Sequence, residues 1–227
     1  MVPYYEHDNI KIYHGDSREI LPDIESVDLV VTDPPYVFGI ASTAKEGKCG
    51  GWGDMMNAAA WYAITLKQLR RATLHREGAV WMFNSWRSFP VLARAAHEVK
   101  WPIESLLVWD KGGLGPGGPR GLRPTYELVA LFAHAEFKIH NRSVPDVMRY
   151  EWSPGKRKTG HPAEKSKELI SRLIKESDYG TILDPFMGSG TTLRAAKEFG
   201  CGGIGIEIEE RWCEYAAKRL AQEVFEL

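Results

Sequence analysis

Residues 33–36 combine a carboxylate, two prolines and an aromatic ring in the string Asp33-Pro34-Pro35-Tyr36. A carboxylate and a backbone carbonyl that both accept hydrogen bonds from an NH2 group would pull its nitrogen towards tetrahedral geometry and free its lone pair. Asp33 supplies the first acceptor, and Pro34 supplies the second because its φ is fixed and it carries no competing N–H. The string therefore predicts activation of an aromatic amino group, although an isolated Asp-Pro-Pro is more often only a turn.

A second string predicts a binding turn for a nucleoside cofactor. It reads Asp184-Pro185-Phe186-Met187-Gly188-Ser189-Gly190-Thr191, and its glycines allow positive φ and a close approach of the backbone to a ligand. The helix that follows would add free N–H groups, which favour a carboxylate. Glu207 ends the next apolar run and would accept hydrogen bonds from ribose hydroxyls. The turn lacks the Gly-x-Gly-x-x-Gly pattern of dinucleotide sites, and the competing interpretation is a generic glycine-rich turn.

Both strings follow apolar runs typical of buried parallel strands, and ligands bind open α/β sheets at the carboxyl ends of such strands. The alternation of strands and helices predicts a mostly parallel seven-stranded sheet with helices on both faces. Residues 103–109 and 126–133 are joined by a glycine-rich loop at 112–121 without a helix, which favours an antiparallel pair. The expected strands are residues 10–13, 27–32, 78–83, 103–109, 126–133, 182–183 and 203–208, and the expected helices are 58–74, 89–99, 163–175, 191–199 and 210–224. Four tryptophans on or beside these elements are expected in the core: Trp81, Trp86, Trp101 and Trp109.

The composition fits one domain over residues 1–227, because 44% of the residues are hydrophobic and can form a sizeable core. The three cysteines form no CxxC pair and the seven histidines show no ligand spacing. We therefore expect a reducing compartment, no disulfide framework and no metal site. The first residues lack the pattern of a signal peptide, and no apolar stretch reaches membrane-spanning length. A soluble cytoplasmic protein is expected.

A basic segment at residues 138–160 is the candidate surface for nucleic acid. The formal net charge is −1, so such a role depends on local patches. Between residues 138 and 158, six Lys or Arg residues are opposed by only two acidic residues, and Tyr150 and Trp152 lie among them. Basic side chains would bind phosphates and aromatic rings would wedge or stack, whereas the competing interpretation is a solvated loop. The candidate DNA contacts are Arg120, Arg123, Arg142, Arg149, Lys156, Arg157 and Lys158.

Over nearly its whole length, the chain resembles the β class of DNA amino-methyltransferases, in which the catalytic motif precedes the cofactor motif. The resemblance implies a Rossmann-like methyltransferase fold with a circularly permuted motif order, in which the last strand lies beside the first. It also implies S-adenosylmethionine as the methyl donor and DNA as the partner. Besides the two strings above, the matching residues are Gly15-Asp16, Trp109-Asp110-Lys111, Arg123-Pro124-Thr125-Tyr126-Glu127, His161-Pro162, Lys165 and Gly205-Ile206-Glu207.

The resemblance also implies roles for residues on both sides of the predicted site. Asp33, Pro34, Pro35 and Tyr36 would be catalytic, with Tyr36 stacking on a base that has been rotated out of the duplex. Asp16 would bind the adenine amino group of the cofactor and Glu207 its ribose. The glycine turn would hold the methionine part, and His161 and Lys165 would border the cofactor. The expected cofactor set is Asp16, Asp33, His161, Lys165, Asp184, Pro185, Phe186, Gly188, Ser189, Gly190, Thr191 and Glu207.

Within this family an Asp at the first motif position usually goes with adenine and a Ser with cytosine, so Asp33 favours adenine N6 as the target. Direct displacement at the methyl carbon is expected, since carbon-5 methylation needs a Cys nucleophile and the chain has no Pro-Cys pair. Cytosine N4, an RNA substrate and a non-catalytic binding module of the same fold are the alternatives. The segment at 138–160 is shorter than the target-recognition insert of larger members. The recognition sequence, a partner nuclease and a contribution from a homodimer are therefore left open.

Overall fold

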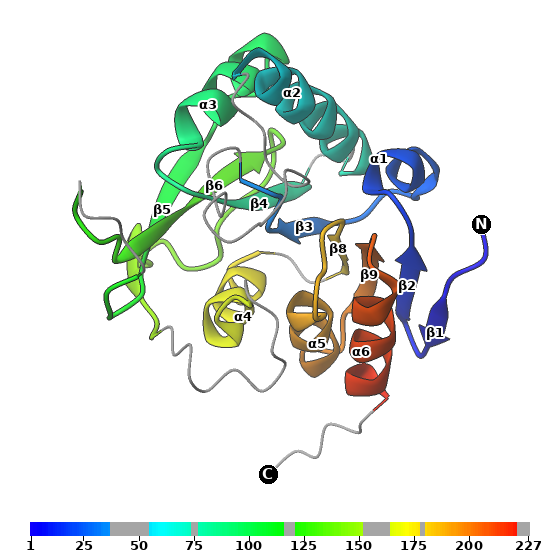
Figure 1. Ribbon diagram of the computed structural model, residues 1–227. Coiled ribbons are helices and arrows are strands. Elements are labelled where there is room, and N and C mark those ends of the chain that lie inside the picture. Colours follow the sequence, from blue (N-terminus) through cyan, green and yellow to red (C-terminus); the bar gives the residue numbers. More distant parts are fainter. Residues whose placement is uncertain (37–54, 74–76, 116–120, 152–163, 178–179, 222–227) are drawn as a thin grey trace.

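A sheet with helices on both sides forms the centre of the computed structural model, which describes residues 1–36, 55–73, 77–115, 121–151, 164–177 and 180–221 (Figure 1). Within these residues the sheet has nine strands in the order β1-β2-β9-β8-β3-β4-β6-β5-β7. The strands are β1 (Tyr5–His7), β2 (Ile10–His14), β3 (Leu29–Thr32), β4 (Ala79–Asn84), β5 (Ser105–Asp110), β6 (Tyr126–Ala133), β7 (Val147–Arg149), β8 (Thr181–Asp184) and β9 (Gly202–Glu207). The helices are α1 (Ser17–Ile20), α2 (Met55–Ala72), α3 (Phe89–Glu98), α4 (Lys167–Lys175), α5 (Thr191–Glu198) and α6 (Glu210–Leu220), with a 3-10 turn at Leu21–Asp23.

The sheet is mostly parallel, as the sequence predicts. Strands β2, β9, β8, β3 and β4 are neighbours in that order, and each pairs in parallel with the next. Strand β6 runs antiparallel to both β4 and β5, which confirms the antiparallel pair predicted around the glycine-rich loop. Strand β7 pairs in parallel with β5. The parallel strands therefore all present their carboxyl ends at the same edge of the sheet.

The predicted number of seven strands is wrong, because the described residues form nine. The two additional strands, β1 and β7, have three residues each and form the outer edges of the sheet. Three residues are too few for an alternating pattern to be distinguished from a loop. Strand β7 also lies inside the segment at 138–160, so part of the predicted target-recognition segment belongs to the sheet.

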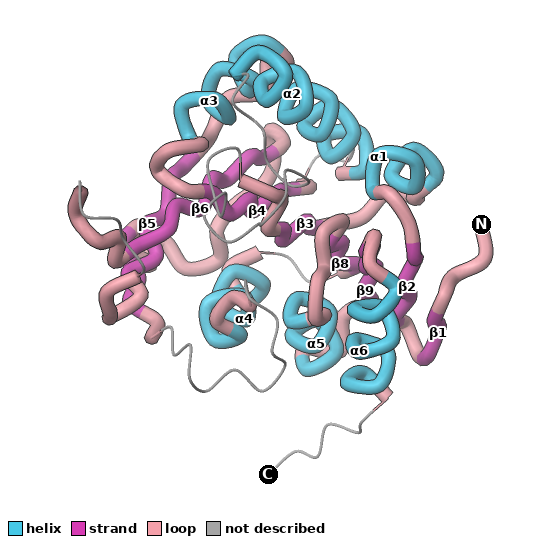
Figure 2. The backbone as a smooth tube through the Cα atoms, viewed as in Figure 1, coloured by secondary structure: helices cyan, strands magenta, loops and turns pink. Residues whose placement is uncertain are grey.

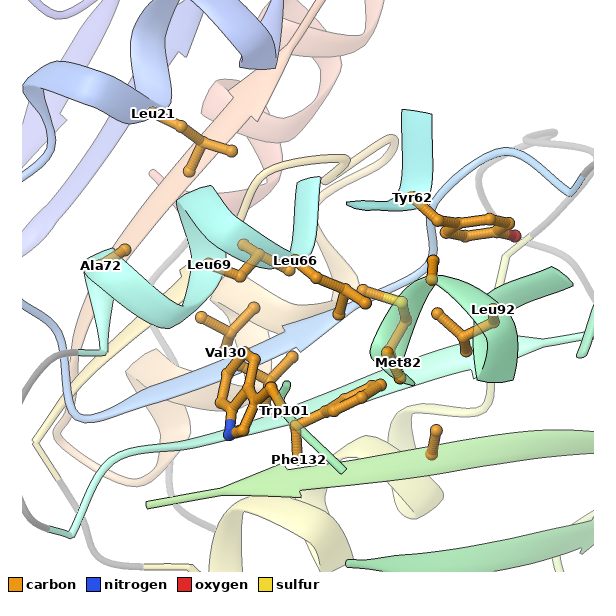
Figure 3. Packing of buried hydrophobic residues seen from close by; sticks show 14 of the residues in the cluster. Leu21, Val30, Tyr62, Leu66, Leu69, Ala72, Met82, Leu92, Trp101 and Phe132 are labelled. Carbon is orange, nitrogen blue, oxygen red and sulfur yellow. The ribbon is translucent and has the colours of Figure 1, made fainter. Parts of the chain in front are cut away.

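Helices α1, α2 and α3 cover one face of the sheet (Figures 1 and 2). Helix α2 is amphipathic, because Tyr62, Leu66 and Leu69 recur every three or four residues and are fully buried. Together with Val30 of β3 and Met82 of β4 they form one apolar cluster (Figure 3). Burying each large apolar side chain contributes roughly 1.5–3 kcal/mol. This packing fixes β3, and with it the start of the Asp33 string.

Helices α4, α5 and α6 cover the opposite face (Figures 1 and 2). The side chain of Ser166 caps α4 by accepting a hydrogen bond of 3.2 Å from the Leu169 backbone N–H. The helix therefore begins at Lys167, four residues later than predicted. Its apolar side packs on the sheet through Leu169, Ile170, Leu173 and Ile174. Lys165 directly precedes the cap, so the start of α4 fixes the position of the Lys165 backbone.

Strand β2 and the last strand of the chain, β9, lie side by side and end at the edge that carries the site. Residues His14 of β2 and Glu207 of β9 are paired in register, and the Gly15 backbone N–H donates to the Glu207 carbonyl at 2.9 Å. In the neighbouring pair, Asp184 of β8 is opposite Gly205 of β9. This confirms the predicted permuted arrangement, in which the ends of β2 and β9 are adjacent.

Candidate active site

The Asp33 carboxylate lies directly after β3, whose four residues are all buried. Its Oδ2 is 2.9 Å from the Lys165 Nζ. Its Oδ1 is buried and accepts no hydrogen bond from any described residue. Burial raises the pKa of Asp33, and the Lys165 ammonium acts against that rise. One oxygen of the predicted catalytic acid is therefore held by a cation, while the other is available as an acceptor.

Lys165 joins Asp33 to a second carboxylate, that of Glu127 on β6. Its Nζ lies 2.8 Å from Glu127 Oε2 and donates to the Tyr36 hydroxyl at 3.0 Å. The same hydroxyl donates to Glu127 Oε2 at 3.1 Å, and Lys111 pairs with Glu127 Oε1. Burial alone would raise the pKa of Glu127, but the two ammonium groups hold it at about 2. Four charges of alternating sign are thus linked by direct ion pairs, and the Tyr36 hydroxyl joins the two central ones.

The aromatic ring of Tyr36 lies where the sequence predicts a stacking residue, after the two prolines. Pro34 is buried and Pro35 is exposed. The Lys165 Nζ lies 5.1 Å from the centroid of the Tyr36 ring and 5.3 Å from that of Phe83 on β4. Burial and the nearby carboxylates raise the pKa of Tyr36 well above its usual value. The hydroxyl therefore stays protonated and acts as a hydrogen-bond donor.

The glycine turn between β8 and α5 has the backbone geometry that the sequence predicts. Gly188 has φ 50° and Gly190 has φ 78°, both in the left-handed region that favours glycine. Gly190 also lacks room for a side chain, because a Cβ there would lie 2.9 Å from the Ala216 Cβ of α6. Ser189 and Thr191 are buried beside them. The conformation of this turn therefore requires glycine, because of positive φ at both positions and because of the contact with Ala216 at Gly190.

Glu207 connects the end of β9 to the glycine turn. Its Oε2 accepts a hydrogen bond from the Gly188 N–H at 2.9 Å, and its Oε1 accepts one from the Glu209 N–H at 2.8 Å. Burial raises the pKa of Glu207, and these hydrogen bonds counteract that rise. Since each carboxylate oxygen has two lone pairs, both oxygens can still accept from a ligand. The predicted ribose-binding residue therefore also positions the predicted methionine-binding turn.

The other predicted cofactor residues are spread around this turn. Asp16 caps α1 by accepting from the Arg18 N–H at 2.9 Å and forms an ion pair with the same residue. Pro185 is buried, and the ring of Phe186 lies 5.7 Å from that of Trp61 on α2. Asp184 is buried and accepts hydrogen bonds from Thr32 and Phe186. His161 falls outside the described residues.

The predicted DNA contacts are described only in part. Arg120, Lys156, Arg157 and Lys158 lie outside the described residues, as does Trp152. Arg123 donates from its Nε to the Gly115 carbonyl at 2.9 Å, so its side chain is held against its own loop. Arg142 is exposed. Arg149 on β7 is also exposed, and its Nε lies 3.9 Å from an Asp110 carboxylate oxygen.

Two features of this edge of the sheet were not predicted from the sequence. Trp86 was expected in the core, but 53% of its surface is exposed, so that prediction is wrong. It lies in the turn after β4, between Ser85 and Arg87, and these polar neighbours are the sequence feature that indicates an exposed position. Trp81, Trp101 and Trp109 are buried as predicted. The second feature is the role of Glu127 in the ion cluster. The sequence feature that indicates it is a charged residue within the otherwise apolar strand β6.

The described residues form neither a metal-binding cluster nor a membrane-spanning helix. No group of three or more His, Cys, Asp or Glu side chains there is arranged to hold a metal ion. None of the helices in that part of the chain is long and apolar enough to cross a membrane.

Known proteins resemble this chain in sequence and in fold. The DNA methylase family model matches residues 27–218. The type II methyltransferase M2.LlaDCHI of Lactococcus lactis subsp. cremoris is 28% identical, over 96% of this chain and 91% of its own. The crystal structure of the M1.HpyAVI–SAM complex is 26% identical with a TM-score of 0.72, and the match covers 94% of this chain and 100% of that one. The PvuII DNA methyltransferase (cytosine-N4-specific) has a TM-score of 0.77 at 20% identity, over 99% and 90% of the two chains, and so shows the fold alone.

Except for Asp16, the matched region contains the described residues that build the site. It begins before Asp33, includes Glu127 and Lys165, and ends after Glu207. The arrangement also suits S-adenosylmethionine, because a strand-terminal carboxylate and a glycine turn lie at the same edge of the sheet as the predicted catalytic acid. The chain therefore belongs to the DNA methylase family, the N6-adenine and N4-cytosine methyltransferases that use S-adenosylmethionine.

Proposed function

We propose that this protein transfers a methyl group from S-adenosylmethionine to the N6 amino group of adenine in DNA. The observation that carries the proposal is the Asp33 carboxylate. Its Oδ1 is buried and accepts no hydrogen bond within the described part of the chain, while its Oδ2 is held by Lys165. Buried polar atoms normally have a partner. An NH2 group of a bound base would provide the donor that this oxygen lacks.

The cofactor would be held by the turn that Glu207 and the two glycines form. S-adenosylmethionine supplies an electrophilic methyl group bound to sulfur. The N terminus of α5, an eight-residue helix that begins after Gly190, favours the carboxylate of its methionine part. Glu207 would accept hydrogen bonds from the ribose hydroxyls. Asp16, at the end of the neighbouring strand, and His161 remain predicted contacts of the adenine side.

Asp33 and the Pro34 carbonyl would activate the target amino group by accepting hydrogen bonds from its two N–H groups. The nitrogen lone pair is then free to form the new N–C bond, while the C–S bond breaks and its electron pair goes to sulfur. The nitrogen afterwards loses one proton, and Asp33 is the nearest base. Tyr36 would stack on the base once it has left the duplex.

Adenine is favoured over cytosine by the residue that begins the catalytic string. The family associates Asp at this position with adenine and Ser with cytosine, and the chain has Asp33. Both targets are amino groups conjugated to a ring nitrogen, so the same two acceptors serve either base. The cytosine-specific neighbour shares the fold at 20% identity and does not decide between the bases.

Incubation of the protein with unmethylated DNA and S-adenosylmethionine, followed by digestion to nucleosides and mass spectrometry, tests the proposal. N6-methyladenine as the dominant product supports it. N4-methylcytosine without methyladenine would assign the enzyme to cytosine. Methylation of RNA but not DNA would overturn the substrate class, and cofactor binding without transfer to any nucleic acid would indicate a binding module.

The division of labour within the site gives a second check. Asp33→Ala is expected to abolish methyl transfer and leave the Kd for S-adenosylmethionine nearly unchanged, because Asp33 contacts the target amine. Glu207→Ala is expected to weaken cofactor binding, since it removes both the ribose contact and the bond to Gly188. Calorimetry with S-adenosylmethionine measures both constants. Equal losses of affinity in the two variants would show that the roles are assigned wrongly.

A further inference from the structure

We propose that Lys165 and Glu127 are positioning residues for methyl transfer, which together fix the orientation of the Asp33 carboxylate and of the Tyr36 ring. This inference rests on the proposed function and deepens it. Lys165 Nζ contacts Asp33 Oδ2 at 2.9 Å, Glu127 Oε2 at 2.8 Å and the Tyr36 hydroxyl at 3.0 Å. Only 9% of the Lys165 side chain is exposed. Sequence similarity alone had implied only that Lys165 borders the cofactor.

The first step of the argument is the orientation of the acid. A free carboxylate presents two equivalent oxygens and can rotate between them. Here Lys165 holds Oδ2, and the buried Oδ1 is the oxygen that accepts no hydrogen bond from the described residues, so Oδ1 is the one left to accept from a ligand. Holding a reacting group in its reactive orientation before the substrate binds removes the entropy cost of reaching that orientation during the reaction. Lys165 thus selects which oxygen of Asp33 receives the target N–H.

The second step concerns the charge of Asp33. Burial raises its pKa, the Lys165 ammonium lowers it and the Glu127 carboxylate raises it. A strong acceptor for the target amine requires the ionised form, which the buried ammonium favours. Lys165 therefore favours the ionised form of Asp33 as well as its orientation. The other titratable groups that interact with Asp33 are Tyr36, Tyr62 and Asp184.

The third step is what holds Lys165. Glu127 uses Oε2 to bind both Lys165 and the Tyr36 hydroxyl, and it pairs through Oε1 with Lys111 of the segment after β5. Glu127 therefore connects the stacking ring to the counter-ion of the catalytic acid. The four charged groups are neutral as a set. Loss of one of them would leave an uncompensated charge in a largely buried place.

A purely structural ion cluster is the alternative, and buried ion pairs are weak evidence for stability in themselves. The location of the cluster favours a role in positioning Asp33 and Tyr36. The cluster joins residues from four separate segments at the carboxyl edge of the sheet, and it ends on the two side chains that would touch the base. The two variants below also have different expected effects on the pH dependence of kcat, which a structural role would not produce.

Steady-state kinetics of methyl transfer to DNA, measured over a range of pH for Lys165→Gln and Glu127→Gln, test the inference. Both variants are expected to lower kcat by on the order of 100-fold, as small misplacements of reacting groups do. The KM for S-adenosylmethionine should hardly change. In Lys165→Gln the acid limb of the kcat profile should move to higher pH, because Asp33 loses the cation that favours its ionised form. In Glu127→Gln the limb should move to lower pH or stay, because a nearby negative charge is removed.

Lys167→Gln is the control, since Lys167 forms an ion pair of similar length but greater exposure with Glu198, at 2.8 Å, two residues along the same segment. It should retain wild-type kcat and pH profile. Lys165→Arg and Glu127→Asp should each recover part of the lost kcat. If Lys165→Gln does not fold, as judged by its thermal melt, the kcat and pH profile of Glu127→Gln decide the question.

Three outcomes would overturn the inference. The first is wild-type kcat in the glutamine variants. The second is a large rise in the KM for S-adenosylmethionine with an unmoved acid limb, which would assign Lys165 to the cofactor. The third is an identical pH shift in both variants, which would indicate a structural role. Absence of methyl transfer by the wild-type protein would instead refute the proposed function, so the two failures are distinguishable.

Discussion

Asp184 links the cofactor strand to the catalytic strand through one buried carboxylate. Its Oδ1 accepts a hydrogen bond from the Thr32 hydroxyl, one residue before Asp33, and another from the Phe186 N–H, both at 3.1 Å. The sequence predicts Asp184 as a cofactor residue, yet only 4% of its surface is exposed. Burial raises its pKa to about 7. Its visible contacts fasten β8 to β3 at the point where the two halves of the site meet.

The raised pKa of Asp184 predicts a specific pH dependence of stability. An acid whose pKa is raised by folding binds more protons in the folded state, so its stabilising effect is lost as pH rises from 3.8 through about 7. Asp184→Asn cannot ionise and should lose no such stabilisation. The free energy of unfolding of the wild type, relative to this variant, should therefore fall by up to about 4 kcal/mol between those pH values. Urea denaturation at several pH values measures it, and a constant difference would contradict the prediction.

At the scale of elements, the turn into α5 depends on glycine for two separable reasons. Gly190 has positive φ, and a Cβ there would meet α6 at Ala216. Gly200, just after α5, has φ 70° but nothing within 4 Å of a built Cβ. The two positions therefore separate the cost of backbone strain from the cost of steric contact.

Gly200→Ala should destabilise the protein by roughly 1 kcal/mol, the cost of placing a side chain in the left-handed region. Gly190→Ala should cost more, because α5 and α6 must also move apart, and it should weaken cofactor binding. Chemical denaturation and calorimetry with S-adenosylmethionine measure the two effects. Equal destabilisation by both substitutions would mean that the contact with Ala216 is relieved without cost.

Long elements were predictable from the sequence because their patterns repeat. The buried run of β3 and the helical spacing in α2 each have enough residues to show a period. Strands β1 and β7 and the four-residue helix α1 do not, and they were missed. The strings around Asp33 and Gly188 were recognisable because each is local. The link from Lys165 to Asp33 and Glu127 was not, since only folding brings those three segments together.

At the scale of the whole molecule, a net charge of −1 means that any electrostatic attraction to DNA depends on local patches of positive charge. Strand β7 carries Arg149 to the outer edge of the sheet, beside the carboxyl end of β5. Its side chain is 66% exposed, whereas Arg123 is held by its own loop. Of these two predicted contacts, Arg149 is the better placed for a phosphate.

Arg149→Gln is expected to weaken binding to DNA of any sequence, and to reduce the log–log slope of affinity against salt by roughly one. Arg94→Gln is the control, because Arg94 on α3 is exposed to a similar extent and its partner is Glu98 in the same helix. Fluorescence anisotropy with labelled duplexes at several salt concentrations gives both slopes. An unchanged slope for Arg149→Gln would indicate a solvated arginine with no phosphate contact.

The position of β3 in the sheet has a consequence for how the protein is made on the ribosome. Its residue Leu29 pairs on one side with Ala79 of β4 but on the other with Ile182 of β8. During synthesis β3 emerges early, and the strand that completes it emerges only near the end. A nascent chain therefore carries an apolar strand with an open hydrogen-bonding edge for most of its elongation, which is the feature that recruits chaperones and promotes aggregation. Chains released before β8 is translated should accumulate as insoluble material, whereas the full-length chain closes that edge itself.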